Sequence, residues 1–204
     1  MHSAFSRRWW VLPVVVSAIL IAAGCDSSAK LTRYSGSIDA CKLPDPATLA
    51  LLVPGTIEVP TDSVKAPQTS VMPADRASGD NELTDCRKVF ARDLGGNKPN
   101  LNDYRLVTIA AVRYTGSDDD VVGPKVRGLM TDAVGDHAGV RLATGIGDEA
   151  GVTDRWAAVR SGNVVMVLEL NDGGSEAALI AAPNVDNVQR VVTGMVDNLK
   201  RLYG

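Results

Sequence analysis

Four ionisable residues have the types and the spacing that acid–base chemistry requires. His137 directly follows Asp136, and Asp148 and Glu149 form a second acidic pair further along the chain. A histidine held beside a carboxylate can exchange a proton near neutral pH, so the four side chains would suit an enzyme if they converged. We favour the competing interpretation, in which His137 follows a helix and interacts with the negative end of its dipole.

Other catalytic and metal-dependent chemistries lack the residues they need. A serine hydrolase of the GxSxG type is excluded because that turn does not occur. A zinc site would need several histidine or cysteine ligands. The acidic run Asp118-Asp119-Asp120 lacks the spacing and the terminal glutamate of a calcium loop, so we expect it to cap a helix. The sequence therefore predicts no metal, no cofactor and no catalytic residues.

Cys25 directly follows an export signal and is a candidate for lipidation. Arg7-Arg8 precede an apolar run over residues 9–23, which is shorter than the roughly 20 residues of a membrane-spanning helix. Ala22-Ala23-Gly24 then leads to Cys25, and this tetrad resembles the bacterial lipobox, although its first position usually holds a larger aliphatic residue. We expect diacylglycerol and palmitate-type chains on Cys25, removal of the signal peptide 1–24, and anchoring at the extracytoplasmic face of the cell membrane.

The chain that remains after processing has the size of one domain. It contains 180 residues, with 19 basic against 24 acidic side chains and a formal charge of −5. An acidic surface gives no electrostatic reason to bind nucleic acid or anionic headgroups. We expect a flexible tether over residues 25–37 and a single domain over 38–204.

Cys41 and Cys86 form an even pair once Cys25 is acylated. Two thiols in an oxidising, extracytoplasmic compartment normally end as a disulfide. This bridge would enclose residues 60–81, whose Pro, Ser, Asp and Thr content predicts a long surface loop. The alternative, a redox-active or metal-binding pair, lacks a CxxC motif and a nearby histidine.

Hydrophobic patterning predicts three helices and five strands. The helices are expected at 46–53, 121–134 and 185–202, and the strands at 56–59, 84–91, 106–114, 156–160 and 163–170. Ser161-Gly162 joins the last two strands as a hairpin. The sequence therefore predicts an α+β fold: an antiparallel sheet of about four to five strands with packed helices and one disulfide.

A glycine-rich turn and a tryptophan mark the candidate ligand cleft. Gly145 and Gly147 permit positive φ, and Asp148 and Glu149 add polar groups, but the third glycine of a nucleotide loop is missing. Trp156 is the one tryptophan that remains after processing. We expect these five residues to line a cleft between sheet and helices. The competing interpretation buries Trp156 in the core.

Several short motifs, taken together, resemble the actinobacterial lipoproteins of the DUF3558 type. They are, in chain order, the lipobox cysteine, Asp39-Ala40-Cys41-Lys42-Leu43, Asp85-Cys86-Arg87, Gly145-Ile146-Gly147-Asp148-Glu149-Ala150 and Val159-Arg160-Ser161-Gly162-Asn163-Val164-Val165. The chain departs from the family pattern at Lys88, because an aromatic residue commonly follows there and Phe90 is the nearest one. The resemblance implies a Cys41–Cys86 disulfide and a cell-envelope address in a mycobacterium-like or streptomycete-like organism. It carries over no catalytic residues.

These observations together favour a lipid-anchored envelope protein whose domain binds rather than catalyses. The expected ligand is a small molecule, a lipid or another envelope protein. Two alternatives remain open at this point: an envelope enzyme that uses Asp136, His137, Asp148 and Glu149, and a purely structural surface lipoprotein.

Overall fold

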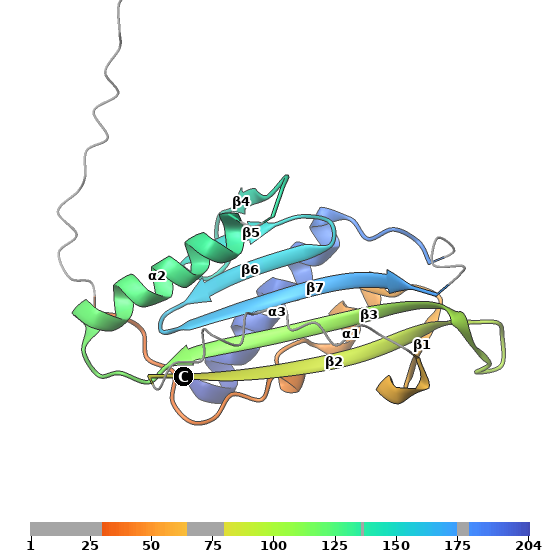
Figure 1. The fold of residues 1–204 in the computed structure, drawn as a ribbon, viewed down its shortest axis with the longest axis horizontal. Helices are drawn as coiled ribbons and strands as arrows, with labels where there is room; N and C mark the ends of the chain where they lie inside the picture. The colour runs from red at the N-terminus through yellow and green to blue at the C-terminus, as the bar shows by residue number, and fades with distance from the viewer. Residues whose placement is uncertain (1–29, 65–79, 136, 175–179) are drawn as a thin grey trace, which may run out of the picture.

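A computed structural model describes residues 30–64, 80–135, 137–174 and 180–204 (Figure 1). The strands in these ranges are β1 (Thr56–Val59), β2 (Asn81–Asp93), β3 (Pro99–Tyr114), β4 (Arg141–Ala143), β5 (Glu149–Val152), β6 (Trp156–Ser161) and β7 (Val164–Gly173). The helices are α1 (Pro46–Leu49), α2 (Asp119–Gly135) and α3 (Val185–Tyr203), with short 3-10 turns η1 (Ala40–Lys42), η2 (Ala50–Leu52) and η3 (Thr61–Ser63). The described strands form one antiparallel sheet in the order β1-β2-β3-β7-β6-β5-β4.

The sheet separates two hydrophobic layers, because side chains alternate between its faces. Met166 and Leu168 of β7 pack on the face that α1 and α3 cover, and Val165 and Val167 pack against α2 on the other face (Figure 1). The even-numbered residues of this strand from Val164 to Leu170 therefore share the face that α3 covers.

Polar side chains cap both long helices: α3 begins at the predicted residue 185, and α2 begins at Asp119, two residues before the predicted start. The carboxylate of Asp118 accepts a hydrogen bond of 2.9 Å from the amide of Asp120 at the start of α2. Asn184 accepts from the amide of Asn187 at 2.8 Å at the start of α3. The apolar residues Val188, Val192, Met195 and Leu199 of α3 recur at helical spacing and are buried. Leu202 continues this spacing, but it is 40% exposed in the last turn.

The fold class is confirmed as α+β, but the expected number of strands is too low. Seven strands lie in the described residues, because β4 and β5 extend the sheet beyond the β6–β7 hairpin. These two strands contain three and four residues, and β5 reads Glu-Ala-Gly-Val. So short a segment with Ala and Gly at its centre carries little of the β-branched alternation that identifies a strand. The turn expected around residues 145–154 is therefore partly a strand.

The disulfide between Cys41 and Cys86 is present, with the two Cα atoms 5.1 Å apart. It joins the turn η1 to the middle of β2, on the side of the sheet that α3 covers. The enclosed ring contains β1 and η3, while residues 65–79 of the expected surface loop lie outside the described residues. The bridge therefore fixes the segment before α1 onto the sheet.

Arg105 forms a buried ion pair in the middle of the sheet. Its side chain is fully buried, and its Nε and Nη2 atoms donate to the carboxylate of Asp172 at 2.5 and 3.1 Å. Its Nη1 atom donates to the carbonyl oxygens of Leu52 and Ala181, the second at 3.2 Å. Arg155 approaches the same carboxylate from a more exposed position at 2.7 Å. One guanidinium thus ties β3 to β7, to η2 and to the segment before α3.

Candidate functional site

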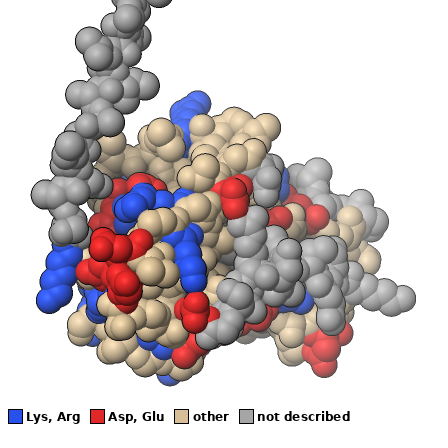
Figure 2. All heavy atoms as spheres, turned by 60° about the vertical axis from the view of Figure 1, so that its left-hand side comes forward, with Lys and Arg blue, Asp and Glu red and all other residues tan. Residues whose placement is uncertain are grey.

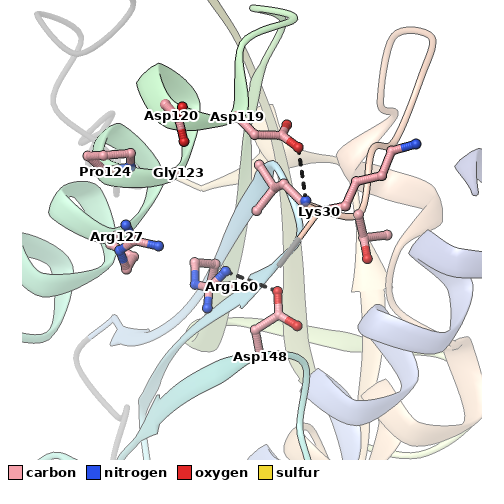
Figure 3. Close-up of a pocket in the computed structure, with 10 residues that line it drawn as sticks. Lys30, Asp119, Asp120, Gly123, Pro124, Arg127, Asp148 and Arg160 are labelled. Atoms are coloured by element: carbon pink, nitrogen blue, oxygen red, sulfur yellow. Dashed lines mark hydrogen bonds and ion pairs between the residues drawn. The ribbon is translucent and has the colours of Figure 1, made fainter. Parts of the chain in front are cut away.

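A cavity of about 480 Å³ opens at the end of the sheet where α2 begins (Figure 3). Its walls come from the N-terminal segment, from the first three turns of α2, from the turn that precedes β5 and from β6. We call it the charged cleft, and its charged lining residues are Lys30, Asp119, Asp120, Arg127, Asp148 and Arg160.

Hydrogen bonds to α2 fix the N-terminal wall of the charged cleft. The amide of Leu31 donates to the Asp119 carboxylate at 3.1 Å, and the guanidinium of Arg33 pairs with the same carboxylate. Arg33 also donates to the carbonyl oxygen of Gly116. Residues 30–33 are therefore held against the start of α2.

The following residues attach the same segment to the β6–β7 hairpin. The amide of Asn163 donates to the carbonyl oxygen of Thr32 at 3.1 Å, and the Asn163 side chain accepts from the amide of Tyr34 at 2.8 Å. Tyr34 is 2% exposed, and its hydroxyl lies 2.7 Å from that of Ser161. The packed part of the chain thus begins before residue 38, where the sequence placed the start of the domain.

The contacts of Asp119 predict a dependence of stability on pH. Hydrogen bonds from Arg33 and from the amide of Leu31 hold the pKa of Asp119 below its ordinary value. At Asp172, burial raises the pKa, but hydrogen bonds from Arg105 and Arg155 outweigh it and lower the pKa overall. Carboxylates with depressed pKa values stabilise the fold fully above the pKa of the unfolded chain, and this contribution is lost as pH falls through the folded pKa. We expect the unfolding temperature to fall as the pH drops below about 4.

Calorimetry between pH 3 and pH 7 measures this effect, and Asp119→Asn is its control. At pH 7 the variant should already unfold at a lower temperature than the wild type. Its unfolding temperature should then fall by less than that of the wild type as the pH is lowered to 3. If the unfolding temperature fell equally with pH in both proteins, Asp119 would not contribute to the pH dependence of stability.

The glycine-rich turn adopts the expected conformation and packs closely on β6. Gly145 and Gly147 have φ values of +79° and +59°. A Cβ atom on Gly147 would lie 2.3 Å from the carbonyl oxygen of Arg160, so a larger residue does not fit. The turn places the Asp148 carboxylate 2.7 Å from the amide of Gly162 and 3.1 Å from Nη1 of Arg160. Glu149 accepts from Nη2 of Arg160 at 3.2 Å, so both acidic residues converge on one guanidinium.

Trp156 lies elsewhere, in the core beneath α2. It is 4% exposed, and the His137 ring stacks on it with centroids 4.1 Å apart. Trp156 and Arg160 are four residues apart on β6, which corresponds to roughly 13 Å of strand. Of the five residues expected to line one cleft, only Asp148 lines the cavity, while Trp156 belongs to the hydrophobic core as the competing interpretation had it.

The same separation applies to the four residues considered for acid–base chemistry. His137 contacts Trp156 at one end of β6, whereas Asp148 and Glu149 contact Arg160 near the other end. Asp136 lies outside the described residues, as does Cys25. The three described members therefore do not meet. Within the described ranges no cluster of three histidine, cysteine, aspartate or glutamate side chains has metal-binding geometry.

Sequence reasoning missed the contributions of Lys30 and Arg127 to the cleft. Lys30 was assigned to a tether, and Arg127 was not singled out within the helix predicted at 121–134. The apolar residues Leu31 and Tyr34, within an otherwise polar stretch, are the signal that could have predicted the N-terminal wall of the charged cleft. Figure 2 shows acidic and basic side chains gathered together on this face of the molecule.

Comparisons of the chain with family models, with curated proteins and with solved structures give no match. The resemblance to DUF3558-type lipoproteins therefore stays a prediction from sequence motifs. No helix within the described residues is long and apolar enough to cross a membrane.

Proposed function

We propose that this protein is a lipid-anchored, extracytoplasmic binding protein that holds a small polar ligand in the charged cleft. The observation that carries the proposal is the position of Lys30 in the wall of that cleft. Lys30 lies five positions after Cys25, and an extended chain spans at most about 3.5 Å per residue. The cleft wall therefore lies within about 18 Å of the proposed lipid.

The contents of the cleft support binding more than catalysis. Its volume falls in the range of roughly 300–1,000 Å³ that small-molecule sites occupy. The carboxylates of Asp119 and Asp148 already accept hydrogen bonds from arginine side chains and backbone amides. At Asp119 these hydrogen bonds hold the pKa below its ordinary value, so this side chain is charged at neutral pH and is a poor proton donor. Charged side chains fixed around a cavity can instead recognise a polar ligand.

The anchor is tested by replacing Cys25 with serine. Acyl chains joined to Cys25 should hold the native protein in the membrane fraction, because two or more chains give stable attachment. We expect the Cys25→Ser protein to move to the soluble fraction and to lack the acyl mass in intact mass spectrometry. Ser28→Ala, which leaves the cysteine in place, is the control. Unchanged membrane association of a Cys25→Ser protein that lacks its leader would contradict the anchor.

Binding is tested by native mass spectrometry of the lipidated protein extracted from its own membrane. We expect an acyl mass on Cys25 together with a second, non-covalent mass that dissociates under mild activation. An acylated protein that carries no ligand in any detergent, and that binds none of the charged probes described below, would favour a purely structural surface lipoprotein.

A further inference from the structure

The charged cleft differs from the rest of the processed chain in its balance of charge. Three basic and three acidic side chains line it, whereas the processed chain as a whole carries a formal charge of −5. Two of the acidic groups, Asp119 and Asp148, are occupied by Arg33 and Arg160 respectively. The charges that remain for a ligand are therefore of both signs.

Asp120 and Arg127 are the clearest of these remaining charges. Neither side chain forms an ion pair or a hydrogen bond with another described residue, and both are exposed. They lie seven residues apart on α2, so they share one face of the helix about 10 Å apart along its axis. The Arg127 guanidinium lies over Gly123, where a Cβ would be 3.6 Å from its Nη1 atom.

Arg160 faces the same cavity from the sheet. Arg127 reaches the cleft from α2 and Arg160 reaches it from β6 (Figure 3). Arg160 binds Asp148 and Glu149 through its terminal nitrogens, but its buried Nε atom has no hydrogen-bond partner among the described residues. Asp148 and Glu149 therefore already neutralise Arg160, whereas no ion pair of the described residues neutralises the exposed Arg127 guanidinium, whose geometry suits phosphate.

The geometry points to a zwitterionic ligand that combines an ammonium group with a phosphate, as in an ethanolamine phospholipid headgroup. The phosphate would pair with the Arg127 guanidinium, and the ammonium would donate to the Asp120 carboxylate. A neutral headgroup also avoids the repulsion that the negative charge of the chain imposes on anionic lipids. This inference rests on the proposed function, because the short link to Cys25 is what holds the cleft near the headgroups.

Calorimetric titration of the lipidated, full-length processed protein in a non-ionic detergent tests the ligand class. The probes are glycerophosphoethanolamine, ethanolamine alone and glycerol phosphate alone. We expect the zwitterion to bind at least about tenfold more tightly than either half, since each charge contributes a separate charge-assisted hydrogen bond. Equal affinity for the zwitterion and for one of its halves would overturn the inference.

Two variants assign the binding to the proposed residues. Asp120→Asn and Arg127→Gln should each weaken zwitterion binding about tenfold. Arg127→Gln should leave the unfolding temperature unchanged, because its side chain has no partner among the described residues, whereas Asp120→Asn should lower it only by the small contribution of a first-turn carboxylate. The matched controls are Asp186→Asn and Arg190→Gln, exposed residues of α3 on the opposite side of the sheet, which should bind as the wild type does. Wild-type affinity in Arg127→Gln would overturn the site.

A vesicle experiment distinguishes a membrane lipid from a soluble zwitterion. The unlipidated Cys25→Ser protein is sedimented with phosphatidylcholine vesicles that contain phosphatidylethanolamine, and with phosphatidylcholine alone, whose quaternary ammonium cannot donate to Asp120. Binding only to the first, and loss of that binding in Cys25→Ser/Arg127→Gln, supports the lipid. Binding of the soluble probe without binding to either vesicle would overturn the lipid assignment in favour of a soluble zwitterion. A missing acyl mass on wild-type Cys25 is a separate result, which would contradict the anchor but not the titration.

Discussion

Arg105→Met is expected to lower the free energy of unfolding by about 3–5 kcal/mol, because it removes one partner of a buried ion pair. The Arg105 side chain is fully buried and makes two hydrogen bonds to Asp172. Methionine fills much of the same volume but cannot donate a hydrogen bond. The Asp172 carboxylate and the carbonyl oxygens of Leu52 and Ala181 would therefore lose their donor in a site with little access to water.

Arg155→Gln is the matched control for this measurement. Arg155 binds the same carboxylate, but its side chain is 42% exposed, and exposed pairs contribute about 0–1 kcal/mol. In urea denaturation at neutral pH, the loss of unfolding free energy should therefore be several-fold larger for Arg105→Met than for Arg155→Gln. Equal losses would show that burial of the Arg105 guanidinium does not decide the energetics of this network.

Removal of the disulfide in Cys41→Ser/Cys86→Ala is expected to lower the free energy of unfolding by about 4 kcal/mol and the unfolding temperature by about 10 °C. The two cysteines are 45 residues apart, and the bridge restricts that loop in the unfolded chain. Alanine suits position 86, because Cys86 is 2% exposed within the core, while serine suits the exposed position 41. Thermal unfolding followed by circular dichroism measures the change.

A reducing agent provides the control for the disulfide. It should lower the unfolding temperature of the wild type toward that of the variant, and it should leave the variant unchanged. Two thiols that react with an alkylating reagent in the native, unreduced protein would contradict the bridge. A variant as stable as the wild type would mean that the ring is already restricted in the unfolded chain.

The sequence predicted those elements whose side chains repeat with a clear period. The β6–β7 hairpin and α3 were placed close to their observed bounds, because each presents a continuous apolar face. β4 and β5 were missed, because strands of three and four residues depend on pairing with their neighbours, β4 with β5 and β5 with β6, rather than on their own sequence. The local pattern thus identified the centre of the sheet and the edge strand β1, which has its predicted bounds, and it failed at the opposite edge.

The charged cleft could be predicted only in part, because its walls are distant in sequence. The turn at residues 145–149 was recognised from its glycines, and Asp148 does line the cavity. Its partner Arg160 lies on another strand, and Lys30 was assigned to a tether. Trp156 was offered as part of the cleft, but the largest aromatic ring of the processed chain is buried against α2, where it removes the most apolar surface from water.

The docking of residues 30–34 has a mechanical consequence. Thr32 and Tyr34 are bonded to Asn163, which closes the hairpin between two central strands. Under the proposed anchoring, only residues 26–29 lie between the lipidated Cys25 and the docked segment. A force on the lipid would therefore be transmitted to the β6–β7 hairpin over this short distance. The domain would then stay close to the bilayer, with the cleft wall at Lys30 no more than about 18 Å from the lipid.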